Sequence, residues 1–345
     1  MIPMRKNHQV LFESLKIDPY IHIPMYEQLA TQFGELIRQN IILKGELLPS
    51  INSACKEIAV SRDTLIAAYK ELQRKGVIES RHGKGFYVKR VPYLNKKKVF
   101  LLFDVMNGYK ETLYRSIVSS LGARYITDIY FHYYNKNLFK KLISESFDDY
   151  DYYIIMPHFN EDMADIVKKI PLAKLIIIDK DIPSMPNAAA VFQEFESDIQ
   201  TAMHQGLSLI RKYNLMYMLI DHEFQFIPDG IVQGFKQFCK KYQIQGGFIE
   251  NIKNHNIEKG ESFIVFTDRD LADIIKIAHE KKYTLGKDIG IISYDETPLK
   301  EVLAGGITVM STDFMLMGRT VARLIEKRMN TKIQNPFRLI VRKSL

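Results

Sequence analysis

Five apolar, strand-like runs of this sequence end in an aspartate. These residues are Asp104, Asp179, Asp221, Asp268 and Asp295. In open α/β sheets, ligands bind beyond the carboxyl ends of the strands, and carboxylates gathered there can accept hydrogen bonds from adjacent sugar hydroxyls. The pattern predicts a polyhydroxylated ligand at a sheet edge. Each aspartate can instead be the N-cap of the helix that follows it, and the sequence leaves this alternative open.

His158 and Phe159 follow a further apolar run that ends at Met156, so we expect them near the same ligand. Catalytic motifs are missing from the sequence: it has no phosphate-binding loop, no dinucleotide fingerprint and no nucleophile elbow. The one His-Glu step, His222-Glu223, lacks the second histidine of a zinc motif. We therefore expect no cofactor, no metal and no catalysis.

A second group of residues with binding chemistry lies near the N-terminus. Residues 51–58 and 61–76 predict two helices separated by a tight turn, and the second helix of such a pair can enter the DNA major groove. Arg62, at its start, can donate two hydrogen bonds to guanine. The predicted DNA contacts are Ser50, Asn52, Ser61, Arg62, Asp63, Thr64, Arg81, His82, Gly83 and Lys84.

The elements that would position these residues follow from periodicity. Apolar residues at three- and four-residue spacing predict a helix over 24–43. The helix over 61–76 has a packing stripe of Leu65, Ala68, Tyr69 and Leu72. Short strands at 77–80 and 86–88 flank a basic loop whose glycines permit a tight hairpin.

Beyond residue 98, strand-like runs alternate with amphipathic helical segments, which predicts doubly wound parallel sheets. With about 245 residues, two lobes are expected rather than one large sheet. The predicted domains are a DNA-binding domain (1–90), a linker (91–98) and a two-lobed α/β domain (99–345). Lobe one would contain about 99–192 and the helix near 314–330, and lobe two about 193–310 and the last strand.

The charge is unevenly distributed between these parts. The chain has 48 Lys and Arg and 40 Asp and Glu, and residues 1–98 carry 17 of the former and 9 of the latter. The whole net charge of +8 therefore belongs to the N-terminal segment, which favours a nucleic-acid contact there over a merely solubilising segment.

The composition and the apolar runs of the chain also indicate the cellular compartment in which the protein acts. No apolar run approaches the ~18–20 residues of a membrane span, and the first residues lack the apolar core of a signal peptide. The two cysteines, Cys55 and Cys239, make no metal or disulfide pattern. We expect a cytoplasmic protein with no membrane contact.

The segment LLPSINSACKEIAVSRDTLIAAYKELQRKGVIESRHGKGFYV resembles the winged helix-turn-helix of the GntR family. Its Leu-Pro-Ser start, Val-Ser-Arg-x-Thr turn, Leu-x-x-x-Gly helix end and Gly-x-Gly wing stand in order. The resemblance implies a DNA-contacting Arg62 and a wing tip at His82-Gly83. Many members have arginine at the position of Asn52, and some have arginine at the position of Ile66. These two differences leave the operator sequence open. A winged helix used for protein contact is the alternative.

Residues 98–345 resemble the effector domain of LacI-type regulators, which shares the type I fold of periplasmic sugar-binding proteins. FIVFTDRDLA and IGIISYDETPLKEVLAGGITVMSTDFMLMGRTVARLIEKR carry the resemblance. It implies that Asp268 lies in a sugar pocket. Ile231 stands where many members have a pocket arginine, and Thr312 where a pocket-edge glutamine is frequent.

The sequence thus predicts a DNA-binding transcriptional regulator, in the manner of a repressor, controlled by a small neutral sugar. Double-stranded operator DNA is the expected partner, and a homodimer is expected because two linked heads gain affinity. Two alternatives remain. The head could be fused to a sugar-processing enzyme, or the chain could be a plain sugar-binding protein, against which the basic head argues.

Overall fold

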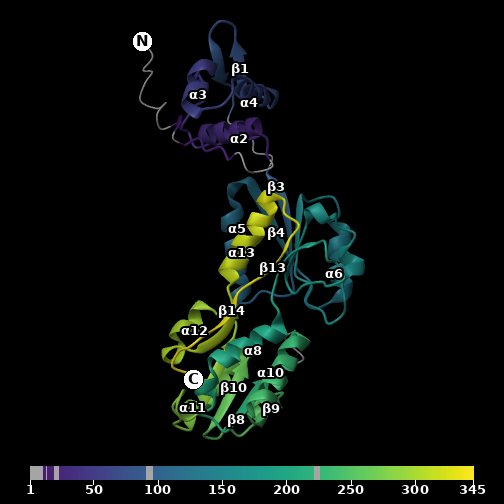
Figure 1. Ribbon diagram of the computed structural model, residues 1–345, viewed down its shortest axis with the longest axis vertical. Coiled ribbons are helices and arrows are strands. Elements are labelled where there is room, and N and C mark those ends of the chain that lie inside the picture. Colours follow the sequence, from purple (N-terminus) through teal and green to yellow (C-terminus); the bar gives the residue numbers. More distant parts are fainter. Residues whose placement is uncertain (1–10, 13, 19–22, 91–95, 221–225) are drawn as a thin grey trace. The chain divides into compact units, whose positions relative to one another are not determined.

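The structure, a computed structural model, describes residues 11–12, 14–18, 23–90, 96–220 and 226–345 (Figure 1). Two compact units divide the chain, residues 1–95 and residues 96–345. Of the linker predicted at 91–98, residues 91–95 lie outside the described residues, and Lys97 already begins the first strand of the larger unit.

The N-terminal unit packs helices against a small antiparallel sheet. Its described elements are α2 (Met25–Arg38), α3 (Ile51–Ile58), α4 (Arg62–Arg74), β1 (Ile78–Arg81) and β2 (Gly85–Val88). The predicted packing stripe of α4 is buried, and its Tyr69 hydroxyl donates to the Pro49 carbonyl at 2.8 Å. α2 ends five residues earlier than predicted because the backbone reverses at Asn40, which has a φ of 59°.

Lobe 1 of the larger unit is built, in its described residues, on a six-stranded parallel sheet of order β13-β7-β6-β5-β3-β4. The strands are β3 (Lys97–Phe103), β4 (Tyr125–Phe131), β5 (Tyr152–Ile155), β6 (Leu175–Asp179), β7 (Ala189–Phe192) and β13 (Lys332–Gln334). The helices are α5 (Gly108–Leu121), α6 (Lys136–Glu145), α7 (Ala164–Val167) and α13 (Phe314–Lys327), with short 3-10 turns at Gly122–Arg124 and Leu172–Lys174. α5 and α13 cover one face, and α6 and α7 the other.

Lobe 2 has the same layered construction, again with six strands among the residues described. Their order is β14-β12-β11-β10-β8-β9, and only β14 within this sheet is antiparallel to its neighbour. The strands are β8 (Leu215–Leu219), β9 (Gly246–Ile249), β10 (Glu261–Val265), β11 (Gly290–Tyr294), β12 (Thr308–Thr312) and β14 (Phe337–Ile340). The helices are α8 (Phe195–Gln205), α9 (Leu207–Ile210), α10 (Asp229–Tyr242), α11 (Asp268–Glu280) and α12 (Pro298–Val302), with 3-10 turns at Ile252–Asn254 and Leu303–Gly305.

The described chain crosses between the lobes three times, after β7, after β12 and after β13. Because of the second crossing, α13 returns to lobe 1 and packs beside α5 (Figure 1). The two helices approach closely at Gly318, where an added Cβ would lie 2.5 Å from the Ser116 side chain. The predicted fold class, a winged helix-turn-helix followed by a two-lobed α/β domain, is confirmed.

Some elements are absent from the sequence prediction. β7 and β13 are short, and α8 has a weak apolar pattern, so periodicity does not reveal them. Gly246 and Gly247, a pair of residues more common in turns than in strands, form the start of β9. Close neighbours explain why these two strand positions hold glycine. A Cβ added to Gly246 would lie 2.7 Å from Cys239 Sγ, and a Cβ added to Gly247 would lie 2.9 Å from the Tyr217 ring.

No helix in the described part of the chain is both long and apolar enough to cross a membrane.

Candidate functional site

The predicted DNA contacts of the helix-turn-helix lie at the amino end of α4. Ser61 caps this helix: its Oγ accepts from the backbone N–H of Thr64 at 3.1 Å and lies 2.7 Å from Thr64 Oγ1. Arg62 and Asp63 form the exposed first turn. The two hydroxyl groups are thus engaged in shaping the helix end, and Arg62 is the long basic side chain that this end presents to solvent.

Ser50 and Asn52 occupy the matching position on α3. Ser50 is the N-cap, and its Oγ accepts from the Ser53 N–H at 3.2 Å. Asn52 is exposed in the first turn. Ser50 therefore has a structural role that does not depend on DNA, whereas Asn52 has a free surface position.

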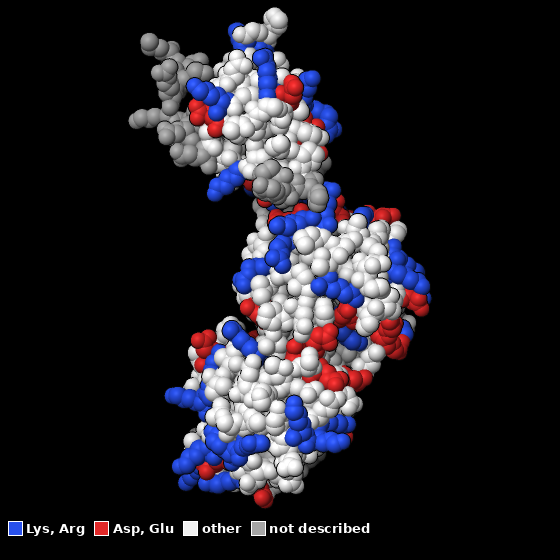
Figure 2. Space-filling view, in the orientation of Figure 1, with Lys and Arg blue, Asp and Glu red and all other residues white. Residues whose placement is uncertain are grey.

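The loop between β1 and β2 is a tight, exposed turn. The Lys84 N–H donates to the Arg81 carbonyl at 2.9 Å, and Gly83 has a φ of 68°. Arg81 pairs with Glu79 at 2.9 Å and lies 4.3 Å from the centre of the Tyr87 ring. His82 and Lys84 are exposed. Since Glu79 offsets Arg81, Lys84 supplies the uncompensated positive charge of this loop. Figure 2 shows basic side chains across this unit.

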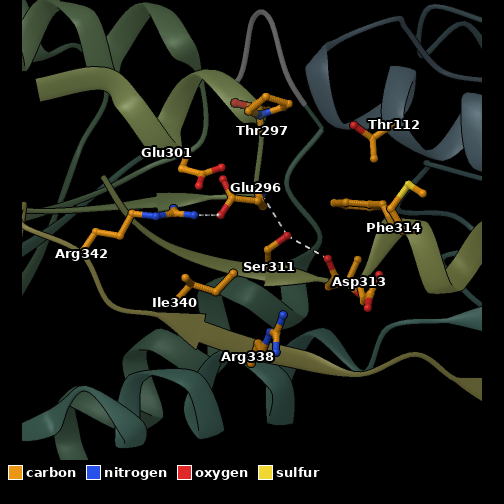
Figure 3. A pocket seen from close by; sticks show the side chains of 13 residues that line it. Thr112, Glu296, Thr297, Glu301, Ser311, Asp313, Phe314, Arg338, Ile340 and Arg342 are labelled. Carbon is orange, nitrogen blue, oxygen red and sulfur yellow. Dashed lines mark hydrogen bonds and ion pairs between the residues drawn. The ribbon is translucent and has the colours of Figure 1, made fainter. Parts of the chain in front are cut away.

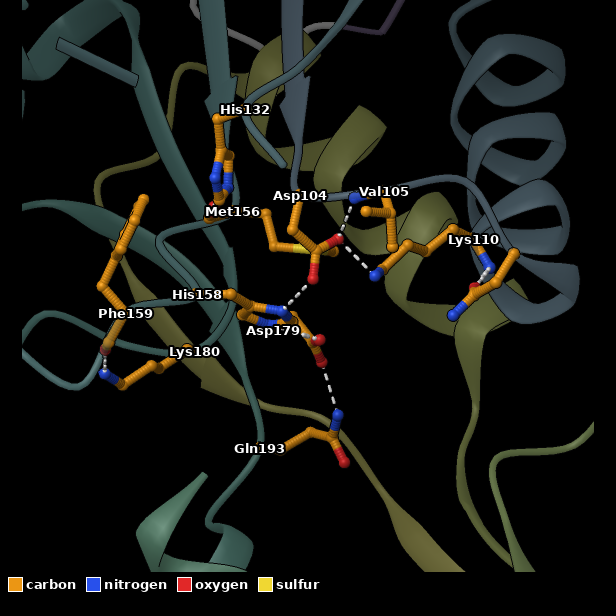
Figure 4. A network of polar contacts seen from close by, with 11 residues as sticks. Asp104, Val105, Lys110, His132, Met156, His158, Phe159, Asp179, Lys180 and Gln193 are labelled. Carbon is orange, nitrogen blue, oxygen red and sulfur yellow. Dashed lines mark hydrogen bonds and ion pairs between the residues drawn. The ribbon is translucent and has the colours of Figure 1, made fainter. Parts of the chain in front are cut away.

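In lobe 1, the predicted ligand residues meet at the carboxyl edge of the sheet (Figure 4). His158 follows β5 and lies between the strand-ending aspartates of β3 and β6. Its Nδ1 is 2.8 Å from Asp104 Oδ2, and its Nε2 is 2.9 Å from Asp179 Oδ2 in an ion-pair contact whose angle falls short of a hydrogen bond. Lys110 of α5 donates to the other Asp104 oxygen, and Gln193 donates to Asp179. All five side chains are buried.

This network compensates its own charges. Burial opposes ionisation of Asp104, but His158 and Lys110 outweigh it and hold the pKa of Asp104 well below its usual range. Burial likewise opposes the imidazolium, yet Asp104 and Asp179 outweigh it and raise the pKa of His158. Two carboxylates, one ammonium and one imidazolium therefore give a neutral assembly. It is the arrangement that buried charges require, since an unpaired charge in a protein interior is costly.

Aromatic rings surround the network. Phe159 stacks on His132 at 4.8 Å within lobe 1 and so packs away from His158. Phe226 of lobe 2 stacks on His158, with ring centres 5.3 Å apart, and on Tyr134 at 6.4 Å. Lobe 2 thus supplies an aromatic cover for the charged histidine.

In lobe 2, the predicted residues Asp268 and Asp295 differ in environment. Thr267, not Asp268, caps α11: its Oγ1 accepts from the Asp270 N–H at 3.0 Å. Asp268 is the first helical residue, with 62% of its side chain exposed and its Oδ1 3.8 Å from Lys300 Nζ. Asp295 directly follows β11, is buried and has a φ of 63°.

The carboxyl group of Asp295 is compensated only in part by a neighbouring charge. Its Oδ1 has no hydrogen-bond partner within the described residues. The buried Lys300 ammonium donates instead to the main-chain carbonyls of Tyr294 and Asp295, each at 2.8 Å. Burial raises the pKa of Asp295 to about 7, and the nearby Lys300 charge offsets burial only in part.

A cavity of about 190 Å³ lies between the two lobes at these strand ends. Its walls come from both lobes: Val105, Asn107, Gly108, Tyr109, Tyr134, Phe266, Thr267, Asp268, Tyr294, Asp295, Thr297 and Lys300. Three buried polar atoms of this lining, Tyr294 OH, Asp295 Oδ1 and Thr297 Oγ1, have no hydrogen-bond partner in the part of the chain that the structure describes. Buried polar atoms are normally paired, so their common opening onto one cavity makes it the candidate ligand site.

Of the eight predicted ligand residues, only Asp268 and Asp295 line this cavity. Asp104, His158, Phe159 and Asp179 belong to lobe 1 and are not among its lining residues. Asp221 lies outside the described residues. Thr312 is buried where the chain crosses between the lobes, its Oγ1 accepting from Asn335 at 2.7 Å and donating to the Pro336 carbonyl at 3.1 Å. It lines a second, larger cavity of about 380 Å³ (Figure 3).

That larger cavity is a weaker candidate for a small-molecule site. Arg342 pairs there with Glu296 at 2.5 Å, and Arg338 and Glu301 are exposed. Two buried polar atoms without a hydrogen-bond partner among the described residues, Glu296 Oε1 and Thr297 Oγ1, also belong to its lining, against three in the interlobe cavity.

Comparison with known proteins is informative for both units. Residues 25–88 match the model of the bacterial regulatory proteins of the gntR family, and residues 217–345 match the periplasmic binding protein-like domain. The HTH-type transcriptional repressor YtrA of Bacillus subtilis (strain 168) is 34% identical over 106 residues, which are 31% of this chain and 78% of YtrA. The chain belongs to the gntR family of bacterial regulatory proteins.

Solved structures resemble the larger unit of this gntR-family regulator. The trehalose repressor from Escherichia coli has a TM-score of 0.60 at 14% identity, over 71% of this chain and 100% of that one. A LacI family transcriptional regulator from Enterococcus faecalis V583, with bound ribose, has a TM-score of 0.58 at 21% identity, over 72% and 98%. The larger unit therefore has the LacI-type, periplasmic-binding-protein-like fold, and the gntR-family chain is a transcriptional regulator.

Sequence reasoning about this gntR-family regulator missed the partners of its aspartates. Lys110, Gln193 and Lys300 are polar residues in ordinary helix or loop contexts, and no local pattern marks them as buried. Lys110 does carry one signal: it stands six residues after Asp104, in the first turn of the next helix. A strand end and the following helix start lie close together in βα units, so such a pair is a candidate ion pair.

We expect His158→Ala to destabilise the protein strongly, because it leaves Asp104 and Asp179 buried without their shared cation. Breaking a buried ion pair costs about 3–5 kcal/mol, which corresponds to a fall in melting temperature on the order of 10 °C. Thermal unfolding of the full chain measures this. His279→Ala, at an exposed position of α11, is the control and should change little; equal melting temperatures for both variants would refute the role of the network.

We expect Asp295→Asn to stabilise the ligand-free protein at pH 8 more than at pH 5. The pKa of Asp295 is about 7 in the folded chain, against the ordinary aspartate value of 3.8. Between these values the folded chain holds a proton that the unfolded chain releases, so stability falls as pH rises through this window. The variant avoids that loss, and asparagine tolerates the positive φ. Melting temperatures at both pH values, with the exposed Asp268→Asn as a control that shows no such trend, test this.

Proposed function

We propose that this gntR-family chain is a sequence-specific repressor of carbohydrate-utilisation genes, controlled by a small polyhydroxylated sugar. The N-terminal unit would bind operator DNA through the amino end of α4 and the β1–β2 loop. The sugar would bind in the interlobe cavity of the larger unit. The chain would act in the cytoplasm as a homodimer, because one small head offers little contact area and linking two heads raises affinity.

The observation that carries the ligand assignment is the unpaired trio Tyr294 OH, Asp295 Oδ1 and Thr297 Oγ1 in one interlobe cavity. A polyhydroxylated molecule offers donors and acceptors to all three, and the rings of Tyr109, Tyr134 and Phe266 supply apolar faces. Sites of this kind, mostly apolar with a few convergent polar groups, are typical of small-ligand binding.

The solved structures support this class of ligand. Of the two LacI-type neighbours, one holds ribose and the other is named a trehalose repressor. Their low identity to this chain transfers the fold but not the sugar, so the proposal stops at the class of ligand. The neighbours and relatives named are transcriptional regulators, which favours binding without turnover.

The proposed control follows from a cavity with walls on both lobes. A ligand that contacts Tyr109 of lobe 1 and Asp295 of lobe 2 at once is bound more tightly when the lobes are together than apart. It can shift the lobes only by this difference in affinity; a coupling of about 1–3 kcal/mol is typical. In a dimer, lobe closure would alter the spacing of the two DNA heads.

We expect operator binding to depend on Arg62 and to weaken steeply with salt. Phosphate contacts release counterions, so affinity falls as salt rises, and Arg62→Ala should lose about 1–3 kcal/mol if the contact is a bidentate base pair. Fluorescence anisotropy with operator DNA measures both. Arg74→Ala is the matched control, because Arg74 lies at the far end of α4 and pairs with Glu71. Operator affinity that survives Arg62→Ala would contradict the proposed surface.

We expect Tyr294→Phe to weaken sugar binding about 3- to 10-fold, the effect of one neutral hydrogen bond. A thermal-shift panel of mono- and disaccharides with the full chain first identifies the ligand, and calorimetry then compares the variants. Tyr213→Phe is the control: its hydroxyl is also buried and unpaired among the described residues, but it does not line the cavity. A panel without any stabilising sugar, or equal losses in both variants, would count against the proposed site.

A further inference from the structure

The charges around the interlobe cavity restrict the class of effector further than the fold does. Lys300 lines it, and Lys110 and His158 belong to the adjoining lobe 1 network. Lys110 pairs with Asp104, His158 lies between Asp104 and Asp179, and Lys300 donates to two main-chain carbonyls. The charges of Lys110 and His158 are thus matched by aspartates, whereas Lys300 keeps its charge and lies 3.8 Å from Asp268 Oδ1.

Asp295 is the buried carboxylate among the lining residues. It is 8% exposed, lines the cavity, and its Oδ1 has no partner within the described residues. The cavity lining therefore holds two carboxylates, Asp268 and Asp295, against one ammonium, Lys300, whose charge offsets the burial of Asp295 only in part.

The remaining walls favour a cation as well. Tyr109, Tyr134, Phe266 and Tyr294 line the cavity together with Asp295. Aromatic faces carry negative partial charge and attract cations, by about 2 kcal/mol or more where water is excluded. Asp268, which is largely exposed, adds a second carboxylate at the edge of the site.

We propose that the effector is an amino sugar or a similar amino polyol, whose protonated amino group donates to Asp295 while its hydroxyl groups bind Tyr294 and Thr297. This inference rests on the proposed function and names the ligand class for the same site. A neutral sugar would leave an ionised Asp295 enclosed with only the partial compensation that Lys300 provides, or would require it to stay protonated. An ammonium group supplies the missing charge and forms the stronger, charge-assisted hydrogen bond.

The inference also predicts how pH acts on binding. Burial raises the pKa of Asp295 to about 7 in the ligand-free protein, so protons compete with the ammonium at Asp295. Of the groups that face this carboxyl, Lys300 and Lys110 are cationic, Asp179 is paired in the lobe 1 network, and His158 is held in its charged form by its aspartates. Affinity for an amino ligand should therefore rise from pH 5.5 to 7.5.

The test is a thermal-shift and calorimetry panel of matched compounds with the full chain at pH 7.5. Each set contains a neutral sugar, its 2-amino derivative and the N-acetylated form, for example glucose, glucosamine and N-acetylglucosamine, and likewise for galactose and mannose. We expect at least one amino compound to bind at least 10-fold more tightly than both its neutral parent and its N-acetyl form, and to alter operator binding.

Variants then locate the charge. Asp295→Asn should weaken binding of the amino compound at least 30-fold and remove its pH dependence, while it changes binding of the neutral parent no more than about 3-fold. Asp165→Asn, which removes an exposed carboxylate that does not line the cavity, is the matched control and should leave the preference intact. Circular dichroism and operator binding confirm that both variants are folded.

The outcomes are distinguishable. Neutral or N-acetylated sugars that bind as tightly as the amino compounds overturn this inference and leave the proposed function standing. An amino compound whose preference survives Asp295→Asn also overturns it. A panel in which no compound of any class binds overturns the inference and counts against the sugar-sensing function itself.

Discussion

The position of His158 between two aspartates is the constraint on which the ligand cleft depends. The sheet order β6-β5-β3 puts the ends of three parallel strands side by side, and two of these ends carry a carboxylate. Two buried carboxylates on one sheet edge repel each other and lose their hydration. A histidine on the middle strand contacts both, at 2.8 and 2.9 Å. Lys110 adds the second positive charge. The two positive and two negative charges cancel, so this edge of the lobe 1 sheet has charged side chains but no net charge.

The two lobes consequently contribute unequally to recognition. The acidic side chains of lobe 1 already have partners within that lobe. Asp104 and Asp179 therefore stabilise the wall of the cleft and do not offer a free hydrogen-bond acceptor. Asp295, which follows β11 in lobe 2, has a similar backbone conformation, φ 63° against 68° for Asp179, but its Oδ1 has no hydrogen-bond partner among the described residues. Chemically similar strand ends thus have different environments, and under the proposed function the discrimination among ligands would belong to lobe 2.

This difference also defines what the sequence can and cannot reveal. Apolar runs that end in aspartate predict a set of carboxylates at sheet edges, because strand length and the final polar residue are local properties. Whether each carboxylate is paired depends on residues such as Gln193 and Lys300, whose burial results from tertiary packing. Asp268 looks like a helix cap in sequence, but Thr267 takes that role. The strand position of Gly247 is likewise hidden in the sequence, because its close neighbour Tyr217 is distant along the chain.

The segment after β11 joins binding to lobe contact. Thr297 has an unpaired Oγ1 in the cavity, and its Cγ2 would lie 2.9 Å from a Cβ added to Gly108, at the amino end of α5 in lobe 1. Lys300, three residues on, holds the carbonyls of Tyr294 and Asp295 and so fixes the loop that carries all three unpaired atoms. A ligand that satisfies these atoms therefore acts on the same few residues that touch the opposite lobe. Because the same residues would contact both the ligand and the opposite lobe, the proposed function would couple ligand occupancy to lobe contact locally, without a long chain of intermediate residues.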